Sequence, residues 1–151
     1  MTQNTFVGLS EAAQLLGRTQ DSIVQRQQAS VILSRQSALE LVFEAWQETN
    51  ESWKIGEGET PVTEAVMETA CRLIQALPLG VPSPAITGEP DGHISLEWYR
   101  NPRRVMTVSI GPDSRLHWAA LIGSEDPRGS ARFADRIPKS LLYYISRVFA
   151  G

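Results

Sequence analysis

The sequence predicts an α+β fold: a helical N-terminal module, then a helix, a three- to four-stranded antiparallel meander and a C-terminal helix. Two patterns predict this order. Apolar side chains recur at helical spacing in the first third of the chain and again over residues 61–77. After residue 92 they alternate with polar side chains, and Gly/Pro turns separate the runs, as between consecutive strands of a meander.

Residues 1–54 are expected to form the helical module. Ser10 is a good helix cap, and the apolar residues after it follow near-helical spacing as far as Leu16. Gly17 ends this helix, because glycine is common just past a helix C-terminus. Thr19 is suited to cap a second helix.

Residues 30–47 fit either of two structures. As a helix they place Val42, Ala45 and Trp46 on one stripe. As a hairpin they pair residues 31–33 with residues 39–43, forming a short wing. The absence of Gly or Pro at the turn slightly favours the helix.

The glycine-rich segment Ile55–Pro61 is the expected boundary, so residues 55–151 form a second, α+β unit. Its first helix is predicted over Pro61–Leu77, with Thr60 as the cap and Glu64 near the positive helix end.

The meander is predicted from turns and alternation. Asp91-Gly92 is a strong hairpin signal, and Asn101-Pro102 and Gly111-Pro112-Asp113 mark two further turns. Between and after these turns apolar residues alternate with polar ones, so that Trp98 and Trp118 are expected on the inward face. Arg128–Asp135 is a candidate fourth strand, and Pro138 opens a helix that runs to Phe149.

Composition excludes several classes of protein. The chain is 42% hydrophobic with a net charge of −3, and no region has the basic excess of a nonspecific nucleic-acid binder. The single cysteine, Cys71, excludes a disulfide framework within the chain. His93 and His117 form no short chelating pair, and no phosphate-binding glycine motif occurs, so neither a metal nor a cofactor is expected. No apolar run reaches the roughly 20 residues of a membrane span, and no signal peptide is visible, so a cytoplasmic protein is expected.

The stretch LSEAAQLLGRTQDSIVQRQ has the spacing of a helix-turn-helix. Ala13, Gly17 and Ile23 supply the small residue, the turn glycine and the aliphatic plug that two closely crossing helices need. Glutamine and arginine read base edges, so the second helix could contact DNA. The residues expected to face DNA are Arg18, Gln20, Ser22, Gln25 and Arg26. A generic helical hairpin is the alternative.

This stretch resembles the helix-turn-helix modules of small bacterial regulators and antitoxins, which run as EAAxLLGxSxxxV. In one such group a two-stranded wing follows, and then an aromatic-Ala-Trp-Gln ending similar to Phe43-Glu44-Ala45-Trp46-Gln47. In this chain Arg18 replaces the aliphatic residue of the turn, and Ser30 stands where glycine would open the wing.

Trp53 to Ile110 resembles a set of short uncharacterised bacterial proteins that have a WDGYGA-like segment and a P-DG-I-LEW hairpin. The match includes Trp53, Pro90 and the run Leu96-Glu97-Trp98, whereas Lys54 replaces an aspartate. This resemblance implies a compact α+β unit and carries no activity.

The sequence offers one candidate catalytic set and one candidate partner-binding set. The register that keeps the apolar stripes together places Ser95, Ser109 and His117 side by side, with Glu97 and Thr107 near. Such a set suits a hydrolase, but a solvated sheet face is the favoured interpretation. Aromatic and arginine side chains dominate protein interfaces. The residues expected to bind a partner are Trp46, Trp53, Arg100, Arg103 and Arg104.

The sequence therefore predicts a non-enzymatic regulatory or antitoxin-like protein. DNA binding is assigned to residues 9–27, and partner binding or self-association to the C-terminal unit. A protein–protein adaptor or inhibitor with no DNA role is the alternative, and a hydrolase on the sheet face is third.

Overall fold

The computed structural model describes residues 34–51 and 56–151. The chain divides into two compact units, Met1–Ser34 and Arg35–Gly151. The first described element is a helix over residues 34–50 (helix 34–50). The later elements are α2 (Glu64–Ala76), β1 (Ala85–Gly88), β2 (Ile94–Asn101), β3 (Arg104–Ile110), β4 (Arg115–Ile122), β5 (Arg128–Arg132) and α3 (Lys139–Phe149).

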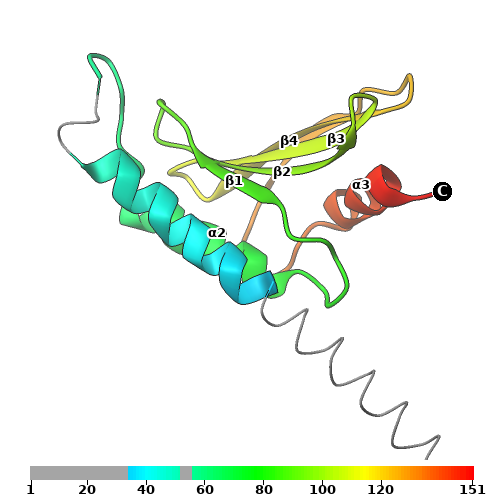
Figure 1. The fold of residues 1–151 in the computed structure, drawn as a ribbon, viewed down its shortest axis with the longest axis horizontal. Helices are drawn as coiled ribbons and strands as arrows, with labels where there is room; N and C mark the ends of the chain where they lie inside the picture. The colour runs from blue at the N-terminus through cyan, green and yellow to red at the C-terminus, as the bar shows by residue number, and fades with distance from the viewer. Residues whose placement is uncertain (1–33, 52–55) are drawn as a thin grey trace, which may run out of the picture. The chain divides into compact units, whose positions relative to one another are not determined.

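The five strands form one antiparallel sheet in the order β1-β2-β3-β4-β5, so the predicted meander is confirmed, but with five strands in place of three or four (Figure 1). The additional strand is β1, which pairs Ala85 with Glu97 and Gly88 with Ile94. Sequence patterns missed it because it is only four residues long and has a single large apolar side chain, Ile86. The candidate fourth strand is β5, which ends at Arg132.

Helix 34–50, α2 and α3 lie on one face of the sheet (Figure 1). The core between these layers includes Leu96, Trp98 and Val108 from the strands and Leu73 and Leu141 from the helices, all at most 1% exposed. The apolar residues of the predicted alternation face this core, and the residues between them face outward. No helix within the described residues covers the outward face.

The choice left open for residues 30–47 is decided for its described part, residues 34–47, in favour of the helix. Ala38 and Val42 of this helix are buried in the same core as the sheet. The division between the two compact units falls at Ser34/Arg35. The polar segment before Pro61 is a connection within one unit.

The helix expected over Pro61–Leu77 begins later, at Glu64, and Thr63 is its N-cap instead of Thr60. The Thr63 hydroxyl accepts a hydrogen bond from the Val66 amide at 3.3 Å. Thr60 is engaged elsewhere, since its amide donates to the Pro90 carbonyl at 2.7 Å. The Val62 amide donates to the Thr49 hydroxyl at 3.1 Å. These two bonds hold the chain extended until Thr63.

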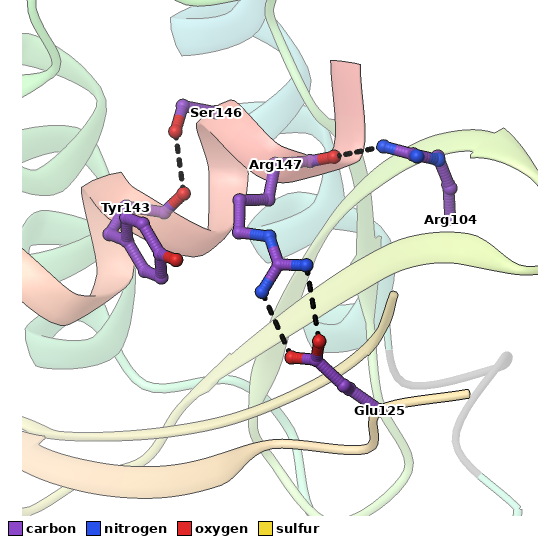
Figure 2. Close-up of polar contacts among 5 residues, drawn as sticks. All are labelled: Arg104, Glu125, Tyr143, Ser146 and Arg147. Atoms are coloured by element: carbon purple, nitrogen blue, oxygen red, sulfur yellow. Dashed lines mark hydrogen bonds and ion pairs between the residues drawn. The ribbon is translucent and has the colours of Figure 1, made fainter. Parts of the chain in front are cut away.

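α3 is attached to the sheet by polar contacts at its C-terminal half (Figure 2). Arg147 reaches the turn between β4 and β5, where Nη1 lies 2.9 Å from Oε2 of Glu125. Arg104 of β3 donates to the Arg147 carbonyl at 2.7 Å. The C-terminal half of α3 is therefore bonded both to β3 and to the turn between β4 and β5.

Candidate functional site

The expected DNA-facing residues Arg18, Gln20, Ser22, Gln25 and Arg26, and the expected partner-binding Trp53, lie outside the described residues. Of the remaining expected partner residues, Trp46 lies on helix 34–50, and the three arginines lie at the β2–β3 turn. These two locations are separate in the fold.

Trp46 is partly buried, and its ring lies 5.3 Å from the ring of Phe43, which is 45% exposed. Leu39 continues this apolar flank one turn earlier and is also partly buried. A shallow hollow beside Phe43 is lined by Gln36, Leu39, Glu40, Phe43, Glu44 and Gln47. We call the hollow together with Trp46 the Phe43 surface. Sequence reasoning found Trp46 but not Phe43 or Leu39, although all three fall at spacings of three and four residues.

The surroundings of the Phe43 surface are acidic. Glu40, Glu44 and Glu48 are exposed at four-residue spacing on helix 34–50. Glu44 and Glu48 also line a groove of about 230 Å³ between this helix and β1, and Leu41, 43% exposed, lines it too. A neighbouring groove of about 260 Å³ adds Glu59 and Glu89. This side of the unit therefore repels phosphate and attracts cationic groups.

Two of the three expected partner-binding arginines hold the end of α3. Arg100 and Arg104 donate to the Ala150 carbonyl at 2.8 and 3.0 Å. Cations stabilise a helix C-terminus because they satisfy its last carbonyls and the negative end of its dipole. Arg103 is exposed, and among the described residues its guanidinium forms no hydrogen bond or ion pair. A structural role thus accounts for Arg100 and Arg104.

The predicted register of the polar sheet face is confirmed, since Ser95 pairs with Ser109, and Ser109 with His117. The hydroxyl of Ser109, however, lies 2.9 Å from Nδ1 of His93, a residue that sequence reasoning did not place in this set. His117 is exposed. No carboxylate among the described residues bonds the His93 ring, so this Ser–His pair lacks the third member of a triad.

Basic residues gather on the same outward face of the sheet, at the edge formed by β5. Arg128 and Arg132 of β5 and Arg115 of β4 are neighbours there, since Arg115 pairs with Arg132. The Arg115 guanidinium donates to the Ser130 hydroxyl at 3.3 Å. The two edges of the sheet therefore differ in charge, with carboxylates beside β1 and guanidinium groups on β5.

Within residues 34–51 and 56–151, no group of three or more His, Cys, Asp or Glu side chains is placed to hold a metal ion. In the same residues no helix has the length and apolar character needed to cross a membrane. Comparisons of the chain with known protein families, with curated proteins and with solved structures found no match.

Proposed function

We propose that the protein is a non-enzymatic regulatory or antitoxin-like binding protein whose Arg35–Gly151 unit binds a partner protein through the Phe43 surface. The observation that carries this proposal is the exposed Phe43 ring against Trp46 on an acidic helix face. Aromatic side chains are frequent in binding hot spots, and an exposed ring that is continuous with other apolar side chains marks an interaction surface.

The charges select the class of partner. Glu40 and Glu44 flank the Phe43 ring, and no basic side chain lines the hollow. A nucleic acid would place its phosphates against these carboxylates, and the repulsion between the like charges would weaken its binding. A helix with an apolar stripe and flanking Lys or Arg residues offers the complementary chemistry, in which apolar residues cover Phe43 and cations meet the glutamates.

The test is co-purification of the full chain with the proteins encoded beside its gene. We expect a basic protein to be retained by the wild type and lost with Phe43→Glu. Leu79→Glu is the matched control, because Leu79 is also an exposed apolar residue, at 68%, but lies outside the Phe43 surface. Retention that is equal for the wild type and Phe43→Glu, or the absence of any retained neighbour, would contradict the proposal.

DNA binding through residues 9–27 is the second candidate, and it is favoured by the helix-turn-helix spacing of Ala13, Gly17 and Ile23. The helix over residues 34–50 removes the wing that residues 39–43 would have contributed. A gel-shift titration against the DNA upstream of the gene at low salt tests this candidate. We expect a specific shift that Arg18→Ala and Arg26→Ala weaken; no specific shift at about micromolar protein would exclude specific binding of that DNA.

A further inference from the structure

The β5 edge of the sheet has open backbone groups. The Ala120 amide donates to the Pro127 carbonyl at 2.9 Å, and the Phe133 amide to the Ser114 carbonyl at 3.1 Å. Because backbone groups alternate in direction along an antiparallel strand, residues 127, 129, 131 and 133 point toward β4. Arg128, Ser130 and Arg132 therefore direct their N–H and C=O groups away from the sheet, and none of the described residues bonds them.

The two faces beside this edge differ in chemistry. On the outward face the side chains of Arg128 and Arg132 are exposed, with Ser130 between them. On the inward face Gly129 has no side chain, and the indole of Trp118 occupies the space above it, 2.4 Å from where a Cβ would stand. The ring of Tyr144 lies 5.2 Å from that of Trp118 and continues the apolar surface.

Trp118 differs from the other tryptophan of the sheet. Trp98 is 1% exposed, and its indole N–H donates to the Pro82 carbonyl at 2.7 Å. Trp118 is only partly buried, and no described residue accepts a hydrogen bond from its indole N–H. A buried tryptophan usually finds such an acceptor. An aromatic ring and a free donor thus lie beside an unpaired strand edge.

We infer that β5 binds an extended segment of another protein, which adds as a sixth strand and alternates acidic and apolar side chains. Its backbone bonds the outward N–H and C=O groups of Arg128, Ser130 and Arg132, as in strand-addition complexes. Its acidic side chains face Arg128 and Arg132, and its apolar side chains lie beside Gly129 and contact the indole of Trp118. This site is distinct from the Phe43 surface.

A second copy of the chain is a poor occupant. Antiparallel pairing of two β5 strands about Ser130 would place Arg128 opposite Arg132 of the other copy, and like charges directly opposite destabilise a strand pair. The arginines exclude basic strands and attract acidic ones.

The test uses the full chain and the peptide acetyl-Thr-Glu-Val-Thr-Val-Glu-Thr-amide, with a dye-labelled copy for fluorescence anisotropy. The matched control peptide has Lys in place of both Glu residues. We expect binding of the Glu peptide and at least about tenfold weaker binding of the Lys peptide. Equal binding of the two peptides, or no binding of the Glu peptide at about millimolar concentration, overturns the inference.

Ser130→Pro tests the edge itself. Proline is tolerated where the N–H points away from the sheet, so the β4–β5 pairing is kept while one outward donor is lost. We expect about tenfold weaker binding of the Glu peptide, with Ser130→Ala as the control that keeps it. Equal binding by these two variants overturns the inference.

A charge exchange keeps the inference testable if Ser130→Pro fails to fold. The double variant Arg128→Glu/Arg132→Glu should prefer the Lys peptide, and an unchanged preference for the Glu peptide overturns the inference. Phe43→Glu should leave peptide binding unaltered, which separates this site from the proposed partner surface.

Discussion

The indole of Trp118 on β4 covers Gly129 on β5 so closely that a Cβ at Gly129 would stand 2.4 Å from Cζ2 and 2.6 Å from Cε2 of the ring. Gly129→Ala must therefore displace the tryptophan. We expect the free energy of unfolding to fall by about 1–3 kcal/mol, the usual cost of overpacking. A urea titration measures this, and Ser130→Ala, on the opposite face of the same strand, should stay within about 0.5 kcal/mol of the wild type. An unchanged Gly129→Ala protein would contradict this packing.

Arg104 connects β3 to the C-terminus of α3 through the carbonyls of Arg147 and Ala150. Arg104→Ala leaves the Arg147 carbonyl without a charged donor and the Ala150 carbonyl with Arg100 alone, and we expect a loss of about 1–2 kcal/mol in unfolding free energy. Arg103→Ala is the matched control, because Arg103 is exposed one residue earlier in the same turn. If both variants lose the same stability, the loss comes from changing the turn itself, and the bonds of Arg104 to the C-terminus of α3 do not stabilise the fold.

Val42 and Phe43 are consecutive residues with opposite environments, fully buried and 45% exposed respectively. Val42→Ala removes two methyl groups from a close-packed site and should cost about 2 kcal/mol. Phe43→Ala should cost less than about 1 kcal/mol, although it removes the larger side chain. Chemical unfolding of the two variants checks this order. The reverse order would mean that helix 34–50 presents its other face to the core.

The strands of the meander could be predicted because each signal was local. Alternation over Ile94–Trp98 and Arg104–Ile110, with Asp91-Gly92 before them, fixes which face of each strand is buried and hence the register. The row Ser95, Ser109 and His117 followed directly from that register.

Features that depend on distant contacts could not be predicted in the same way. The start of α2 is set by bonds from Thr60 and Val62 to Pro90 and Thr49, which no local pattern reports. β1 is a strand because β2 lies beside it. The hydrogen bonds of Arg104 could not be predicted because their acceptors lie at the C-terminus of α3, more than forty residues later in the chain.

Cys71 of α2 has a pKa raised first by burial and second by the charge of Glu68. The thiolate is the nucleophile, so alkylation by iodoacetamide at pH 8 should be slower than that of a free thiol. A raised folded-state pKa contributes stability that is complete below the unfolded-state pKa and is lost as pH rises through the folded-state pKa. Stability should thus fall on the alkaline side, and Cys71→Ser should flatten that fall. Glu68→Gln should accelerate alkylation modestly; alkylation at the rate of a free thiol would contradict the assignment.

Glu125 forms two hydrogen bonds with Arg147, at 2.9 and 3.3 Å, in the turn that links β4 to β5. The pKa of Glu125 is lowered first by this hydrogen bonding and then by the positive charge of Arg147. A lowered folded-state pKa contributes stability that is present above the unfolded-state pKa and is lost as pH falls through the folded-state pKa. The stability difference between the wild type and Glu125→Gln should therefore be found at neutral pH and vanish in acid. Because the pair is exposed, added salt should shrink this difference. An NMR titration of the Glu125 carboxyl gives the direct measurement, with a midpoint that rises in Arg147→Gln. Equal midpoints in the two proteins would show that the ion pair does not hold the turn against α3 in solution.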